Sequence, residues 1–89
     1  MKIIKIVYSD QSKFILELVK QLTTKVYVES FNVSHYKEKK KAIPILTRHG
    51  TTNVPLIVFE NENLEEYAAI WSESYPDWIV EINKILLNE

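Results

Sequence analysis

The polar residues directly after the first apolar run are the first candidates for chemistry in this sequence. The segment reads Ser9, Asp10, Gln11 and Ser12, and a stretch with helical periodicity follows it. Ser and Asp side chains in such a place accept hydrogen bonds from the first N–H groups of a helix. Two interpretations stay open: helix capping alone, or a site at the helix N-terminus for an anion or another ligand. A serine nucleophile needs a base within hydrogen-bond reach, and the sequence nominates none.

Histidines and charged runs add no second site. His35 and His49 lack the i, i+4 partner or the cysteines that a metal site would need, so no metal is expected. The basic run Lys37–Lys41 (KEKKK) lacks interleaved aromatic residues, and the net charge is -1, so no nucleic-acid partner is expected. The acidic run Glu60–Glu66 has two interpretations: a solvated turn, or a patch whose sign, opposite to that of the lysines, steers self-association.

The composition excludes one class of reaction. There is no cysteine, and therefore no thiol–disulfide chemistry. A chain of 89 residues that is 46% hydrophobic supports one domain, residues 1–89, with one modest core. The apolar N-terminus is short and interrupted by Lys5, so we expect a strand there and not a signal peptide. No run is long enough to span a bilayer and no disulfide is needed, so we expect a cytoplasmic protein without a membrane partner.

The first half of the chain predicts a strand, a helix and a second strand. Residues 2–8 form a near-continuous apolar run, which is typical of a strand buried on both faces. A helix follows, with its apolar face at Phe14, Ile15, Leu18, Val19 and Leu22. Residues 26–33 alternate as a second strand does, and a strand, helix and strand over this length indicate a parallel crossover unit. Residues 34–41 are polar and predict a loop or a frayed helical turn.

The second half predicts a short helix, two strands and a terminal helix. Pro44 suits the first turn of a helix that runs to Arg48, and Gly50 can end that helix with a positive φ. Residues 55–60 predict a third strand, and residues 64–71 a returning strand, although the latter also fit helical spacing. Ser74 and Asp77 have the spacing of a capping box before the last helix. The apolar face of that helix comprises Trp78, Ile79, Ile82, Ile85 and Leu86.

Aromatic residues near the chain's end allow two interpretations. Trp71 and Trp78 are expected to pack between the last strand and the last helix. If the returning strand lies at a sheet edge, Tyr67 and Trp71 would instead form an exposed aromatic patch, which would mark an interface.

The predicted order β-α-β-(short α)-β-β-α is similar to that of thioredoxin-like and glutaredoxin-like domains. RHGTTNVPLIVFENEN resembles their pattern of glycine, loop, apolar residue, proline, apolar strand and polar turn. SYPDWIVEI resembles their last helix and VYVESFNVS their central strand. The resemblance covers most of the chain and implies an α/β thioredoxin-like fold with a mixed four-stranded sheet and flanking helices.

The resemblance also implies a binding face. In these families the proline at the position of Pro55 follows a cis peptide bond, and the backbone of the residue before it pairs with an extended substrate segment by β-strand addition. Asn53, Val54 and Pro55 are therefore candidate partner-binding residues, together with the segment Ser9–Ser12. This use of the backbone needs no cysteine.

The first helix departs from the family pattern. The family carries Cys-x-x-Cys-Lys where this sequence has Ser9-Asp10-Gln11-Ser12-Lys13, so either both cysteines are serines, naturally or by engineering, or the redox loop is shortened. A serine at this position also resembles the arrangement in glutathione transferases, which have a hydroxyl near the first helix. The segment NVPLIVFENENLEEYAAI loosely resembles their Val-Pro run, with Glu66-Tyr67 in place of Glu-Ser. The main prediction is a redox-inactive module that binds a protein or extended peptide, with no catalytic residue and no cofactor. The alternatives are a glutathione-binding, transferase-like enzyme and a subunit of an assembly, such as a homodimer.

Overall fold

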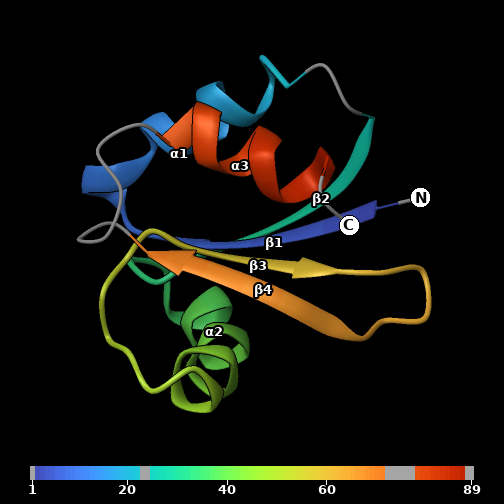
Figure 1. Ribbon diagram of the computed structural model, residues 1–89. Helices are drawn as coiled ribbons and strands as arrows, with labels where there is room; N and C mark the ends of the chain where they lie inside the picture. The colour runs from blue at the N-terminus through green and yellow to red at the C-terminus, as the bar shows by residue number, and fades with distance from the viewer. Residues whose placement is uncertain (1, 23–24, 72–77, 88–89) are drawn as a thin grey trace.

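The structure, a computed structural model, describes residues 2–22, 25–71 and 78–87. Its elements are β1 (Lys2–Tyr8), a 3-10 turn (Asp10–Ser12), α1 (Phe14–Val19), β2 (Val26–Asn32), α2 (Tyr36–Arg48), β3 (Leu56–Glu60), β4 (Glu66–Trp71) and α3 (Trp78–Leu87). The strands form one sheet in the order β2-β1-β3-β4 (Figure 1). β1 is parallel to β2 and antiparallel to β3, and β3 is antiparallel to β4. The predicted mixed four-stranded sheet is confirmed.

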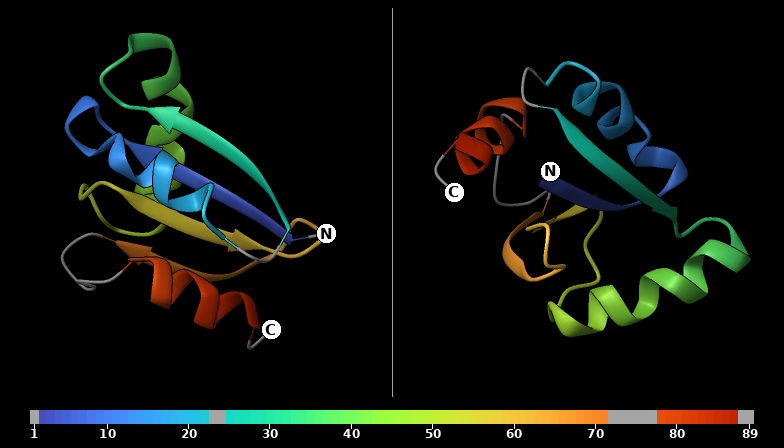
Figure 2. Two further views of the ribbon diagram at one scale, coloured as in Figure 1. Left: turned by 90° about the horizontal axis from the view of Figure 1, so that it is seen from above. Right: turned by 90° about the vertical axis from the view of Figure 1, so that its right-hand side faces the viewer.

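The helices cover both faces of the sheet. α1 and α3 lie on one face, and α2 lies on the other (Figures 1 and 2). Successive side chains of a strand point to opposite faces, so Ile6 and Tyr8 belong to one core cluster and Val7 to the other. The α1/α3 core comprises Ile4, Ile6, Tyr8, Ile15, Val19, Ile57, Phe59, Ile70, Trp78, Ile82 and Leu86. The α2 core comprises Val7, Ala42, Ile45, Leu56 and Val58.

The central strands are those with the most continuous apolar sequence. Every residue of β3 is buried, because β3 has a strand on each side and a helical layer on each face. Its last residue, Glu60, is only 2% exposed, and its Oε2 lies 3.0 Å from Nζ of Lys5. Two-sided burial is the condition under which a strand reads as an apolar run instead of an alternating one.

The prediction for α2 was wrong in length. Residues 34–41 were expected to form a loop or a frayed helical turn and Pro44 to lie in a first turn, but α2 spans Tyr36–Arg48 with Pro44 inside. Ala42 and Ile45 are buried against the sheet, and this packing stabilises a helix whose first turns have no apolar periodicity in the sequence. Pro44 lies on the exposed side of the helix. The carbonyl of Lys40, which would accept an N–H from position 44, also belongs to an exposed residue and can be hydrated.

The first helix is shorter than predicted, and its buried face is rotated slightly from the predicted one. It begins with the 3-10 turn, and its regular part ends at Val19, so Leu22 lies beyond it although Leu22 still packs against the α1/α3 core. Ile15 and Val19 are buried as expected, but Phe14 is 50% exposed. The buried stripe is therefore centred about one residue later than the sequence pattern indicated.

The returning segment is a strand, as predicted, and it lies at a sheet edge. The expected patch of Tyr67 and Trp71 does not form, because Tyr67 packs against the α1/α3 core and Trp71 against the α2 core. For the same reason Trp71 does not share a layer with Trp78. The predicted capping box at Ser74 lies outside the described residues. Within the described ranges, no helix combines the length and apolar character needed to cross a bilayer.

Candidate functional site

Two of the segments singled out in the sequence meet at one end of the sheet. β1 ends at Tyr8 and β3 begins at Leu56, and the two strands are antiparallel with Val7 opposite Leu56. Continuing that register places Ser9, just after β1, next to Val54, just before β3. The structure thus brings the segment Ser9–Ser12 and the loop before β3 to the same edge (Figure 1).

Ser9 and Ser12 are hydrogen-bonded to each other. Ser9 is the N-cap residue of the 3-10 turn, and its N–H donates to Oγ of Ser12 over 2.9 Å. The two Oγ atoms lie 3.2 Å apart. Oγ of Ser12 can also donate to the carbonyl of Ser9, and Ser12 is only 6% exposed. Both hydroxyls therefore serve the local geometry of the turn, which is what helix capping requires.

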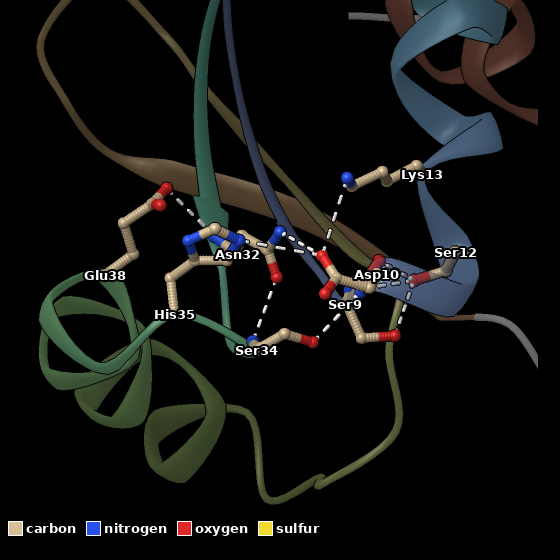
Figure 3. Close-up of polar contacts among 8 residues, drawn as sticks. All are labelled: Ser9, Asp10, Ser12, Lys13, Asn32, Ser34, His35 and Glu38. Carbon is tan, nitrogen blue, oxygen red and sulfur yellow. Dashed lines mark hydrogen bonds and ion pairs between the residues drawn. The ribbon is translucent and has the colours of Figure 1, made fainter.

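Asp10 joins this turn to the end of β2 (Figure 3). Nδ2 of Asn32 donates to Oδ1 of Asp10 over 2.8 Å, and the N–H of Asp10 donates to Oγ of Ser34 over 3.0 Å. The N–H of Ser34 donates to Oδ1 of Asn32. Asn32 is 3% exposed, and its own N–H donates to Oε1 of Glu38. A closed polar network thus fixes the 3-10 turn against the start of α2.

The charge of Asp10 is stabilised by its neighbours. The hydrogen bond from Asn32 is the main cause that lowers the pKa of the Asp10 carboxyl, and the nearby side chains of Lys13 and His35 lower it further. Nζ of Lys13 lies 3.6 Å and Nε2 of His35 lies 3.7 Å from Oδ1 of Asp10. Asp10 and Gln11 are exposed, so this end of the sheet presents an ionised carboxylate to solvent.

The loop after α2 is fixed by the helix end. Gly50 has φ +64°, as expected for the residue that ends the helix. The N–H groups of Gly50 and Thr51 donate to the carbonyls of Thr47 and Leu46, which together form a Schellman motif. The N–H of Asn53 donates to Oγ1 of Thr51. The loop reaches β3 in a conformation set by these bonds.

Val54 presents its backbone at this edge. The Val54-Pro55 peptide bond is cis, as the resemblance implied, and Pro55 is buried. The side chain of Val54 packs against the α2 core. Among the described residues, neither the N–H nor the carbonyl of Val54 forms a hydrogen bond. A donor and an acceptor are thus left at the end of the sheet where the partly exposed Ser9 follows β1.

The structure also has a hollow that the sequence analysis missed. It has a volume of about 620 Å³ and lies between α2 and the loop that follows it. Its apolar lining includes Val33, Ile43, Leu46 and Val54, and Lys39 contributes a cation. The stripe of residues 39, 43, 46 and 47 on α2 was not visible as a helical face because the helix was predicted to begin at Pro44. Only a helix predicted over its full length, from Tyr36, would have shown this stripe in the sequence.

A group of three ionisable residues, Arg48, His49 and Glu66, anchors the C-terminal end of α2 to β4. The guanidinium of Arg48 donates from Nε and Nη2 to the two carboxylate oxygens of Glu66, and Nε2 of His49 lies 3.2 Å from Oε1 of Glu66. The hydrogen bond from Arg48 lowers the pKa of Glu66, and the same bond raises that of Arg48. Sequence reasoning did not pair these residues. No group of three or more His, Cys, Asp or Glu within the described ranges is placed to hold a metal ion.

Comparison with solved structures identifies the class of fold. A thioredoxin from Thermus thermophilus superposes with a TM-score of 0.58 and 14% identity, over 98% of this chain and 72% of that one. A malarial protein gives 0.56 and 13% over 96% of both chains. The DsbH oxidoreductase gives 0.54 and 11% over 99% of this chain and 74% of that one. The chain therefore has a thioredoxin-like fold, which confirms the resemblance.

The particular chain differs from thioredoxin in having no cysteine. No protein-family model and no curated protein sequence matches it. With the fold established and the Cys-x-x-Cys pair absent, thiol–disulfide exchange by its own side chains is excluded.

Proposed function

We propose that this domain is a redox-inactive binding module, which takes an extended peptide segment of a protein partner along Val54. The observation that carries the proposal is the backbone of the partly exposed Val54, whose donor and acceptor have no partner among the described residues. An extended segment can satisfy both groups by β-strand addition. Ser9 and Asp10 border the same edge and would contact the segment's side chains or backbone.

The rigidity of this edge supports binding over a purely structural role. The Schellman motif at Gly50 and the bond from Asn53 to Thr51 set the loop, and the network around Asn32 sets the 3-10 turn. A surface that is already ordered loses little conformational entropy on binding. The two borders of the edge are thus pre-organised by separate sets of hydrogen bonds.

The test is an amide NMR titration of the labelled protein with a pool of short extended peptides. We expect shifts confined to residues 9–13 and 53–56. A matched pair of variants separates backbone from side-chain recognition. Val54→Ala keeps the N–H and should retain binding, whereas Val54→Pro removes the N–H and should abolish it. A well-dispersed spectrum of each variant shows that the fold is intact.

Two results would decide against the proposal. The first is the absence of shifts at residues 53–56 with every peptide in the pool. The second is binding that Val54→Pro leaves unchanged. Reduced glutathione is titrated in parallel, because the alternative of a glutathione-binding enzyme requires shifts with that ligand alone.

A further inference from the structure

The turn between β3 and β4 carries an exposed leucine in an unfavourable backbone conformation. Leu64 has φ 63°, a left-handed conformation that non-glycine residues rarely adopt, and the residue is 69% exposed. Glycine or asparagine is the residue that such a position favours. Burial does not compensate for the choice of leucine, so local stability does not explain it. Such outliers point to contacts that the isolated chain does not make.

The turn holds this leucine in place. Oδ1 of Asn61 accepts the N–H groups of Asn63 and Glu65, and the N–H of Asn61 donates to the carbonyl of Glu65. The N–H of Leu64 donates to the carbonyl of Asn61. Leu64 therefore projects from a turn that is closed by four hydrogen bonds, beside the carboxylate of Glu65.

The hollow beside α2 has the complementary chemistry. Its apolar walls include Val33, Ile43 and Leu46, and Lys39 lines it with a cation. A volume of about 620 Å³ is ample for one leucine side chain with its flanking residues. α2 also carries the exposed residues Lys37, Lys40 and Lys41, with Glu38 as its one acidic residue. A leucine followed by the carboxylate of Glu65 fits both the shape and the charge of this surface.

A chain cannot make this contact with itself. The β3–β4 turn lies at one end of the sheet, and residues 50–55, which border the hollow, lie at the other end (Figure 1). We propose that Leu64 of one copy docks into the hollow of a second copy, with Glu65 facing Lys39. The contact does not depend on the proposed peptide function, but the two share Val54, which also lines the hollow.

The contact joins two different surfaces, and this limits the assembly it can make. Two copies that each insert Leu64 into the other form a closed two-fold dimer, and a single insertion per pair would extend into a chain of molecules. An antiparallel pair brings each turn to the partner's hollow and makes the contact twice, whereas a head-to-tail pair makes it once. We therefore expect a dimer.

The experiment is sedimentation velocity of the full chain between about 10 µM and about 1 mM, a range that detects weak association. The sedimentation coefficient should rise with concentration. Leu64→Asn should weaken the association about tenfold or more, because it removes the apolar side chain. Asparagine tolerates positive φ, so the free energy of unfolding should not fall. The matched control is Leu87→Asn, which changes a leucine that is 76% exposed on α3 and should leave association unchanged.

Charge reversal tests the register of the contact. Lys39→Glu and Glu65→Lys should each weaken association, and the double variant should restore it, since both partners then exchange sign. Raising the salt concentration from about 0.05 M to about 0.5 M should also weaken the wild-type contact. A protein that stays monomeric throughout would overturn the proposal. So would association that survives Leu64→Asn, because another surface, such as the exposed edge of β2 with Tyr27 and Val28, would then be responsible.

The two proposals fail separately. In the Leu64→Asn chain the peptide titration should still shift Val54, because the leucine is remote from the peptide edge. In Leu64→Asn, loss of self-association with intact peptide binding is the result that both proposals expect. Absence of peptide binding in wild type, at a concentration where it is monomeric, would overturn the peptide function alone.

Discussion

At the scale of single residues, the Ser9 and Ser12 side chains are close enough to test their correspondence to a cysteine pair. Their Oγ atoms are 3.2 Å apart. We expect the double variant Ser9→Cys/Ser12→Cys to form an intramolecular disulfide under mild oxidation, since a disulfide needs the two Cβ atoms only about 3.5–4.5 Å apart. Mass spectrometry and thiol counting would detect it, and each single variant serves as the control. Dimers linked between chains, without the internal bond, would indicate the shortened-loop alternative instead.

Asn32 is the residue whose loss should disturb this end of the sheet most. It is 3% exposed and bonds Asp10, Ser34 and Glu38. Asn32→Ala should lower the free energy of unfolding by about 1–3 kcal/mol, because the carboxylate of Asp10 and the N–H of Ser34 lose their hydrogen bonds to the Asn32 side chain, whereas the backbone bond to Glu38 is kept. Denaturant unfolding measures this, with Gln11→Ala as the exposed control. An effect no larger than that of the control would mean that the network is not ordered in solution.

The same variant should raise the pKa of Asp10. The hydrogen bond from Asn32 is the main cause that lowers this pKa, and Asp10 is ionised above it. A lowered carboxyl pKa contributes stability that is present above the unfolded pKa and is lost as the pH falls through the folded one. An NMR titration of the Asp10 carboxyl in wild type and Asn32→Ala should show the value returning toward its ordinary range of about 3.9. An unchanged value would assign the shift to Lys13 and His35.

At the scale of elements, the ion pair of Arg48 and Glu66 ties α2 to β4. The pair lowers the pKa of Glu66, so its contribution is present above the ordinary glutamate pKa and is lost as the pH falls through the lowered value. Glu66→Gln should lower the free energy of unfolding at neutral pH by about 1 kcal/mol or less. The difference from wild type should vanish in acid. Glu17→Gln is the control, because Glu17 and Lys20 form an ion pair whose side chains are over 70% exposed.

The prediction from the sequence failed at α2, which contains Pro44 in its interior. A variant at this position tests how much the proline destabilises the helix. Pro44→Ala restores an N–H for the carbonyl of Lys40 and should raise the free energy of unfolding by about 1–2 kcal/mol, below the full helix-interior penalty because proline also restricts the unfolded chain. Lys41→Ala, an exposed change in the same helix, should be near neutral. Destabilisation by Pro44→Ala would show that the proline has a packing role.

The parts predicted correctly depend on local pattern. The runs of β1 and β3 are apolar because both faces are covered, and Gly50 ends α2 because only glycine adopts its φ without strain. The start of α2 depends instead on the packing of Ala42 and Ile45 against the sheet, and the local sequence does not encode that contact. The hollow depends on that helix, and the role of Asn32 depends on Asp10 lying beside it across 22 positions of sequence. These features exist only once the elements are packed.

At the scale of the whole molecule, the two proposed contacts are coupled through Val54, which borders both the peptide edge and the hollow. A copy whose hollow is filled by a second chain would have its Val54 partly covered. Self-association should therefore weaken peptide binding by mass action, with the apparent affinity falling as the protein concentration rises above the dissociation constant of the dimer. In Leu64→Asn this concentration dependence should disappear, and the peptide affinity should match that of dilute wild type.

Isothermal titration of one peptide at several protein concentrations measures this coupling. The control Leu87→Asn should behave as wild type, because it replaces an exposed leucine of α3, which lies on the opposite face of the sheet from the hollow. A peptide affinity that is independent of concentration in a chain shown to dimerise would mean that the two contacts are compatible. The peptide would then reach Val54 from the side of Ser9 while the hollow is occupied, and the module could carry a partner as a dimer. A falling affinity would instead make the dimer a reservoir that releases binding-competent monomers on dilution.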